Sequence, residues 1–265
     1  MYTHPMLTAI PKPPESHWIH PARWLAISSM LADHLARYLH PGNLDHYWLA
    51  ATFGRLAFPL FAAMLAWHLL FHTRSPLLYA GRILLIGLVA QPVYALMIGI
   101  PLSYPWLNVC FTLAAGLLLG SGLKHLLALA QQPGWRPDLL HWLGMALALL
   151  LAWLVAPWLD YGLPGILLVP CLVLVFWLMQ QPASSSQSLI GSVVLTGFVG
   201  LGLNSFGLPT FSSLLALAFI LLGVKNSGRL QRMKGYMPPL PRWLWLSFYP
   251  GHLLLVVMLS HAVRH

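Results

Sequence analysis

Residues 163 to 179 read LPGILLVPCLVLVFWLM, a run without a charged side chain that approaches the twenty residues an α-helix needs to cross a bilayer. Comparable apolar runs recur along the whole chain. Of its 265 residues, 58% are hydrophobic and only 7% are charged, and the mean hydropathy is +0.73. Soluble domains carry far more charge, so the sequence predicts an all-α, polytopic integral membrane helical bundle.

Nine apolar segments, separated by proline, glycine and charged residues, are expected to cross the membrane. They are Trp24–Leu39, Tyr47–Phe71, Ala80–Ile100, Trp106–Ala130, Leu139–Trp158, Leu163–Met179, Ser188–Leu203, Pro209–Val224 and Trp243–Ala262. The first contains charges and the seventh is short and rich in glycine, so eight or ten crossings also fit. We expect a polar cytoplasmic segment at residues 1–22 and a single membrane domain at residues 23–265.

Lysine and arginine gather at the ends of alternate segments, and cytoplasmic loops are where such residues are retained. With the N-terminus inside, the cytoplasmic side carries Lys12, Arg23, Arg74, Arg82, Lys124, Arg136, Lys225, Arg229, Arg232, Lys234 and Arg242. The net charge of +9 fits this topology together with attraction to anionic membrane lipid. It also fits a cytoplasmic site for a phosphate-rich cofactor, and we expect no nucleic-acid partner.

Asp33 and His34 form an ionisable pair inside the first predicted crossing, in a chain with only five acidic residues. A carboxylate at that depth costs roughly 2.5 to 3.5 kcal/mol, so it is expected to face the bundle interior and to serve a function. Arg23 precedes His34 by eleven residues. At 100° per residue the two lie on nearly the same helical face, about 16 Å apart along the axis. That spacing suits coenzyme A, an extended ligand with phosphates at one end.

The chemistry predicted at His34 is acyl transfer, with a neutral imidazole as general base for an attacking amine or hydroxyl. Asp33 points about 100° away from its neighbour on the helix, so it is expected to pair with Arg55 or with another histidine. A structural Asp33–Arg55 ion pair beside a hydrogen-bonded core histidine explains the same spacing equally well.

Other polar groups in apolar surroundings are candidates for contact with a substrate. Arg55 is placed to stabilise an oxyanion or bind a carboxylate, and Asn108 is a hydrogen-bonding partner at similar depth. His252 follows a Tyr249-Pro250-Gly251 break in the last crossing and is placed to position substrate or cofactor. Asp160, between two crossings, can attract a cationic acceptor, although a solvated loop acid is the commoner case. The remaining histidines show no metal-ligand spacing, so no metal is expected.

These residues resemble the TraX family of conjugal pilus pilin acetylases, which is related in its first crossing to the acyltransferase-3 membrane family. The features that carry the resemblance are Arg23 with Asp33-His34, the block Gly54-Arg55-Leu56-Ala57-Phe58-Pro59-Leu60-Phe61, the Arg82 to Gln91 crossing, Asn108 before an apolar helix, Tyr161-Gly162 with Gly165, and Phe248-Tyr249-Pro250-Gly251-His252. They extend over nearly the whole chain, from about residue 23 to residue 257.

The resemblance implies a protein of the bacterial inner membrane that transfers an acetyl group from cytoplasmic acetyl-CoA, the acyl donor. The implied acceptor is the N-terminal amine of a pilin. Because the central crossings keep only the apolar character of the family, another envelope acceptor also fits: a lipid, a sugar hydroxyl or another peptide amine.

Two hypotheses follow from these residues. In the first, residues 23–265 form a membrane acyltransferase domain in which His34 and Asp33 are catalytic and Arg23 and Arg82 bind coenzyme A phosphates. The substrate-binding residues are then Arg55, Asn108, Tyr161, Tyr249 and His252. The rival is a membrane transporter or proton-coupled permease, in which Asp33, His34, Arg55 and His252 form a proton relay.

Overall fold

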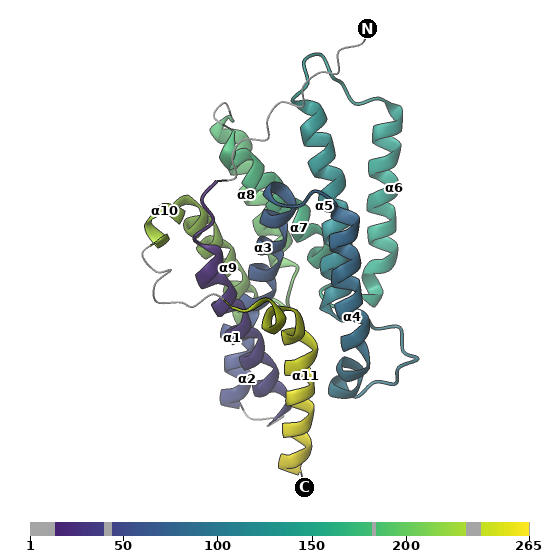
Figure 1. Cartoon of the computed structure of the whole chain (residues 1–265), viewed down its shortest axis with the longest axis vertical. Coiled ribbons are helices and arrows are strands. Elements are labelled where there is room, and N and C mark those ends of the chain that lie inside the picture. The colour runs from purple at the N-terminus through teal and green to yellow at the C-terminus, as the bar shows by residue number, and fades with distance from the viewer. Residues whose placement is uncertain (1–13, 40–43, 182–183, 232–239, 265) are drawn as a thin grey trace.

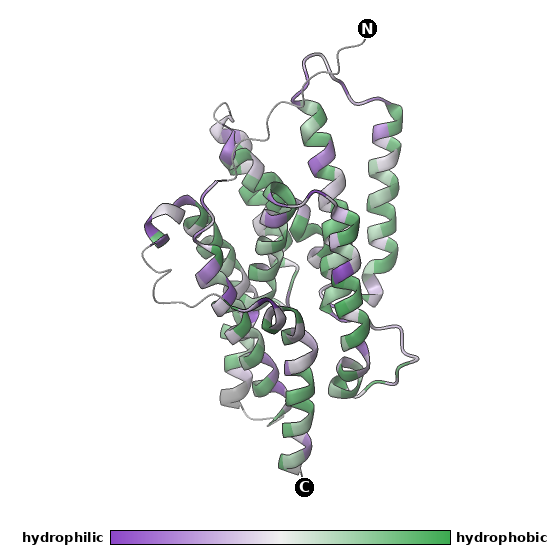
Figure 2. Ribbon diagram, in the orientation of Figure 1, coloured by the Kyte–Doolittle hydropathy of each residue, from purple (hydrophilic) through white to green (hydrophobic). Residues whose placement is uncertain are grey.

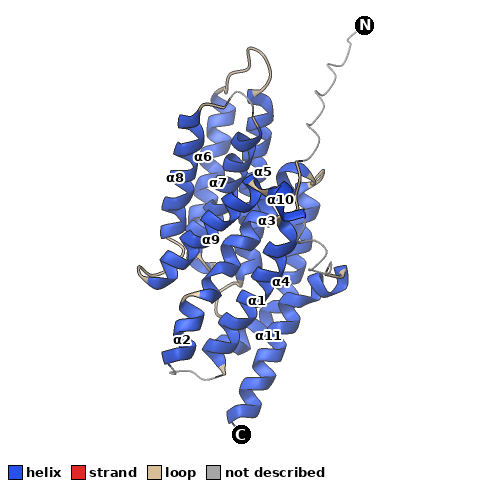
Figure 3. Cartoon of the chain, turned by 90° about the vertical axis from the view of Figure 1, so that its left-hand side faces the viewer, coloured by secondary structure: helices blue, strands red, loops and turns tan. Residues whose placement is uncertain are grey.

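The structure, a computed structural model, describes residues 14–39, 44–181, 184–231 and 240–264, and every regular element in these ranges is a helix (Figure 1; Figure 3). The α-helices are α1 (Ile19–Tyr38), α2 (Leu44–Ala51), α3 (Ala57–Phe71), α4 (Pro76–Ile98), α5 (Val109–Ala130), α6 (Leu139–Val155), α7 (Gly162–Gln180), α8 (Ser186–Leu201), α9 (Leu208–Lys225), α10 (Ser227–Leu230) and α11 (Arg242–Arg264). The 3-10 helices η1 (Phe53–Leu56) and η2 (Ala156–Trp158) precede α3 and follow α6. The predicted all-α bundle is confirmed, whereas most of the polar segment predicted at residues 1–22 lies outside the described residues.

All nine predicted crossings fall largely on helices, but only seven helical segments of the described chain have the length and hydropathy of a membrane span. The first predicted crossing lies on α1, which carries Arg23, Asp33 and Arg37, and the seventh lies on α8, which has only 16 residues. The second is interrupted by η1, and the fourth begins at Val109 rather than Trp106. The chain is therefore a polytopic helical membrane protein in which α1 and α8 depart from ordinary spans.

The core of the bundle is built around α3 and α7. Trp67 of α3 packs edge-on against Trp18 and against Phe176 of α7, with ring centroids 5.6 Å and 5.4 Å apart. The outer helices α4, α6 and α11 instead expose large hydrophobic side chains along their length. Figure 2 shows that their ribbons are coloured mainly as hydrophobic. An apolar outer surface around a packed interior is what lipid solvent favours, because the bilayer, not water, covers it.

The turn η1 brings the chain against α1. Ser29 of α1 donates its hydroxyl hydrogen to the carbonyl oxygens of Phe53 and Gly54, at 2.6 Å and 3.2 Å. These contacts satisfy backbone groups at the point where the crossing is interrupted. Gly54 permits the close approach, since a Cβ atom there would lie 2.6 Å from Oδ1 of Asp33. The helix break therefore sets Arg55 beside Asp33.

The loops before α5 and before α7 are joined to each other. The N–H of Leu107 donates to the carbonyl of Trp158 at 2.8 Å, and the N–H of Asp160 donates to the carbonyl of Leu107 at 3.0 Å. Leu107 and Leu159 form an isolated parallel β-bridge. This connection holds Asp160 and the following residue next to the start of α5.

Candidate active site

A small cavity lies where α1, η1, α3, α4, α5, α11 and the loop before α7 converge. Its volume is about 30 Å³, and its polar lining consists of Asp33, His34, Tyr94, Asp160, Tyr161 and Tyr249. One water needs about 10 to 15 Å³ by the same kind of measure, so the cavity has room for one or two waters. The sequence-predicted residues Asp33, His34, Tyr161 and Tyr249 thus meet in one place.

His34 and His252 form a hydrogen-bonded pair across α1 and α11. Nδ1 of His34 lies 2.8 Å from Nε2 of His252, and Nδ1 of His252 lies 2.8 Å from the carbonyl oxygen of Phe248. Because a carbonyl only accepts, His252 Nδ1 carries the hydrogen and its Nε2 accepts from Nδ1–H of His34. The remaining nitrogen of His34, Nε2, is then left with a lone pair, the form required of a general base.

Asp33 is held by two arginines. Its Oδ1 accepts from Nε of Arg37 at 2.9 Å and from a terminal nitrogen of Arg55 at 3.2 Å. Its Oδ2 lies 3.9 Å from Nε2 of His34, an ion-pair distance that is too long for a hydrogen bond. The predicted Asp33–Arg55 pair is confirmed. The carboxylate is placed beside the imidazole nitrogen that would become protonated.

Arg55 has little freedom to reach a substrate. Beyond Asp33, it donates to the side-chain oxygen of Asn204 at 3.1 Å and to the carbonyl of Ala50 at 3.3 Å. Asn204 in turn donates to Ser213 of α9 at 2.8 Å. The guanidinium therefore links η1, α1 and α9, and its first effect is to fix the position of Asp33.

Arg23 lies against the same helix that contacts His34. Its guanidinium stands 5.3 Å from the ring centroid of Trp245, a cation–π contact, while His34 bonds to His252. Trp245 and His252 are seven residues apart, about two helical turns, so they share one face of α11. The two predicted residues of α1 therefore face α11 together. Among the residues that the structure describes, none forms a hydrogen bond with the buried Nε of Arg23, and Arg23 does not line the cavity at His34.

Two predicted site residues lie elsewhere. Arg82 is exposed on α4. Asn108 is fully buried. Its side-chain amide donates to the carbonyl of Gly87 and to Oε1 of Gln91, both at 2.8 Å. Its side-chain oxygen caps α5 by accepting from the N–H of Cys110 at 3.0 Å. Both of its donor hydrogens are engaged between α4 and α5, so the structure gives Asn108 a structural position instead of one facing a substrate.

Asp160 and Tyr161 form the wall of the cavity that precedes α7. Tyr161 has a φ of 63°, a left-handed conformation that is uncommon for an aromatic residue, and its ring stacks on Phe58 at 4.0 Å between centroids. The carboxylate of Asp160 accepts from the backbone N–H of Tyr161, and burial raises the pKa of Asp160 to about 6. The loop acid is thus a half-buried group that lines the cavity and not a fully solvated one.

Sequence reasoning missed one charged member of this cluster, Arg37. The sequence spacing could have indicated this contact, because Arg37 follows Asp33 by four residues and residues at that spacing meet on one face of a helix. Asn204 and Ser213 carried no such local signal, since they reach Arg55 from a distant part of the chain.

Comparison with known proteins places the chain in a family. The model described as TraX protein matches residues 21–260, which include every residue of the site described above. No curated protein and no solved structure matches significantly. The family is linked to conjugation and to the modification of pilins. The chain, a membrane protein with several long apolar helices, belongs to the TraX family.

Proposed function

We propose that this protein is an acetyl-CoA-dependent acetyltransferase of the bacterial inner membrane, and that its acceptor is an amine, in the first place the N-terminal amine of a pilin. The observation that carries the proposal is the Phe248–His252–His34 hydrogen-bond chain, which leaves Nε2 of His34 as a base at the cavity. An orienting partner behind a catalytic imidazole is the arrangement that general-base catalysis uses to fix the tautomer.

The reaction has a balanced proton path through these residues. The acceptor nitrogen attacks the carbonyl carbon of the thioester and forms the C–N bond while Nε2 of His34 takes a proton from that nitrogen. Collapse of the tetrahedral intermediate breaks the C–S bond, and His34 returns the proton to the departing sulfur. Oδ2 of Asp33, 3.9 Å from Nε2, stabilises the transient imidazolium.

Arg23 is proposed to bind phosphate of coenzyme A. The side chain of Arg23 is half-buried and its Nε has no hydrogen-bond partner among the described residues, so a phosphate oxygen that reached it would satisfy an existing donor. Its distance of about 16 Å from His34 along α1 leaves room for the pantetheine arm, with Trp245 and His252 of α11 along the way. Arg82, exposed on α4, is a second phosphate contact in this proposal.

Asp160 is proposed to bind the acceptor as an ammonium. Its carboxylate lines the cavity together with Tyr94, Tyr161 and Tyr249, and aromatic rings around a carboxylate form a favourable site for a cation. The ammonium loses its first proton before attack, so each turnover releases one proton to solvent. A hydroxyl acceptor could donate a hydrogen bond to this carboxylate but carries no charge to pair with it, so we expect an amine to bind more tightly.

The proposed orientation places the N-terminus and Arg23 at the cytoplasmic face, because acetyl-CoA is a cytoplasmic metabolite and the lysines and arginines gather on that side. The acceptor then meets the acetyl group at the deeper end of α1, near Asp160.

The proposal is tested with purified protein in lipid nanodiscs, acetyl-CoA and a peptide with a free α-amine, using mass spectrometry to detect the added acetyl group. His34→Ala is expected to lower turnover at least 100-fold, as loss of a general base does. His68→Ala is the matched control, because His68 is also an intramembrane histidine, bonded to the carbonyl of Met64 and away from the cavity. Full turnover by His34→Ala would remove His34 from the chemistry.

Arg23→Ala is expected to raise the KM for acetyl-CoA about 10- to 100-fold with a smaller change in kcat, since a charged hydrogen bond contributes about 1.5 to 3 kcal/mol. Arg82→Ala is compared under the same conditions, and its effect should be smaller because the side chain is exposed. An unchanged KM in Arg23→Ala would place the coenzyme elsewhere.

The hydrogen-bonded histidines also favour a second function, a proton-coupled transporter, because adjoining titratable groups can relay protons. Thermal denaturation separates the two. A ligand of the folded state raises the unfolding midpoint with its concentration, so acetyl-CoA should do so for the transferase. The absence of any shift, together with proton flux in liposomes that is lost in His34→Ala, would favour the transporter.

A further inference from the structure

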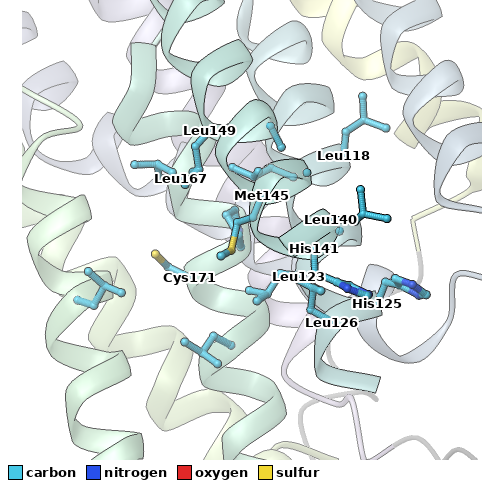
Figure 4. A pocket seen from close by; sticks show the side chains of 17 residues that line it. Leu118, Leu123, His125, Leu126, Leu140, His141, Met145, Leu149, Leu167 and Cys171 are labelled. Atoms are coloured by element: carbon cyan, nitrogen blue, oxygen red, sulfur yellow. The ribbon is translucent and has the colours of Figure 1, made fainter. Parts of the chain in front are cut away.

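A second and much larger cavity lies between α5, α6 and α7, away from His34. Its volume is about 570 Å³, and apart from His125 and His141 its walls are apolar, including Met145 of α6 and Cys171 of α7 (Figure 4). Nothing in the proposed reaction uses this space.

The cavity exists because α6 packs closely at only one end. Near its C-terminus, Ala152 and Ala156 form a small buried cluster with Leu159 and Ile166. Toward its N-terminus the facing residues are small, and neither Gly122 of α5 nor Gly144 of α6 has a neighbouring heavy atom within 4 Å of an added Cβ. Between the two helices there is therefore a partly open apolar groove that no side chain of the described chain fills.

The dimensions of the gap identify its occupant. From His141 to Leu149 the cavity extends about 12 Å along α6, which is close to the roughly 15 Å of hydrocarbon in one leaflet. A single flexible apolar chain from the same leaflet fits both the length and the volume.

The hydrogen-bond donors at the mouth of the cavity favour a phosphate-containing headgroup. His125 and His141 are the polar side chains of the otherwise apolar lining, and Figure 4 labels both. Arg136 lies in the loop between their helices, and the nearby acid, Asp138, is already bonded to Nδ1 of His141 at 2.6 Å. The donors that remain at this edge suit a phosphate oxygen.

We propose that the cavity between α5, α6 and α7 binds one acidic phospholipid, with an acyl chain against Met145 and Cys171 and its phosphate near His125 and His141. The bound lipid completes the packing of α6 on α5 and α7. The site is separate from the acetyl-transfer cavity and does not depend on the proposed function.

Native mass spectrometry of the full-length protein, purified in mild detergent with added phosphatidylglycerol, tests the proposal. One phosphatidylglycerol should remain bound to the wild-type chain, and Gly144→Phe, which fills the cavity, should lower that occupancy at least tenfold. Gly191→Phe is the matched control. It places the same ring on an exposed position of α8 with no heavy atom within 4 Å of the added Cβ, and it should retain the lipid.

A photolabelling experiment on the unaltered chain avoids any effect of substitution on folding. Phosphatidylglycerol with a diazirine on its acyl chain should label peptides containing Met145 and Cys171 above the exposed, lipid-facing surface of α4. Uniform labelling of all outer helices, equal retention in Gly144→Phe, or a polypeptide retained in place of lipid would each overturn the proposal. Equal retention of phosphatidylcholine would overturn the assignment of an acidic headgroup.

Discussion

Asp160→Asn isolates the effect of burying a carboxylate beside the base. Burial raises the pKa of Asp160 from the ordinary 3.8 to about 6, so the folded protein holds this proton more tightly than the unfolded chain does. Below pH 4 the carboxyl is protonated in both states and the substitution should have little effect. As the pH rises through about 6, the wild-type protein loses stability because a buried charge forms.

The difference between the two pKa values corresponds to about 3 kcal/mol, reached above about pH 7. Asp160→Asn is therefore expected to raise the unfolding midpoint by several degrees at pH 8 and by little at pH 4. The same variant should lose affinity for an amine acceptor, because it removes the charge that would bind the ammonium. The two effects have opposite directions, which a simple folding defect cannot produce.

Asp138→Asn serves as the control of opposite sign. Hydrogen bonds from His141 lower the pKa of Asp138, so its contribution to stability is present at neutral pH and is lost as the pH falls through the folded-state value. The Asn variant should thus be less stable than wild type at pH 8 and equal to it in acid. Thermal unfolding in detergent at pH 4, 6 and 8 measures both variants. If Asp160→Asn gains no more stability at pH 8 than at pH 4, the burial argument is wrong.

Two further substitutions test the geometry of the site. Gly54→Ala should displace the carboxylate of Asp33 and destabilise the protein by about 1 to 3 kcal/mol in thermal unfolding, whereas Gly81→Ala, with nothing near the new Cβ, should not. His252→Leu should lower kcat for acetyl transfer at least tenfold with a smaller change in KM, because Nδ1 of His34 loses the acceptor that fixes its tautomer. His252→Gln, whose amide oxygen can accept the same hydrogen bond, should recover part of that loss, and equal activity of the Leu and Gln variants would count against the orienting role.

The helical bundle was readable from the sequence because hydropathy and charge report directly on the surrounding solvent. Runs such as residues 163–179 have no alternative to a buried helix in a membrane. The two departures also had local signals, since α1 carries charges and α8 is short. The interruption of the helix at η1 had no local signal in the sequence. It depends on Ser29 of another helix, which donates a hydrogen bond to the carbonyls of Phe53 and Gly54.

Parts of the site followed from helix geometry alone. Arg23 and His34 face α11 together, as their spacing of eleven residues predicts, and Asp33 pairs with Arg55. Pairings between distant segments could not be read in this way. Nothing local indicates that the last helix supplies the partner of His34, or that a loop joined to Leu107 buries Asp160.

Under the proposed function, a resting pocket with space for only one or two waters would protect the thioester from hydrolysis. A base kept in an open aqueous groove would activate water as readily as an amine. In the proposed reaction, the acceptor must first separate the helices and loops that close around His34. The acetyl group is therefore transferred only after the acceptor has bound. In the proposed reaction this opening is a gating step that precedes the chemistry, and such motions of loops and helices take microseconds to milliseconds.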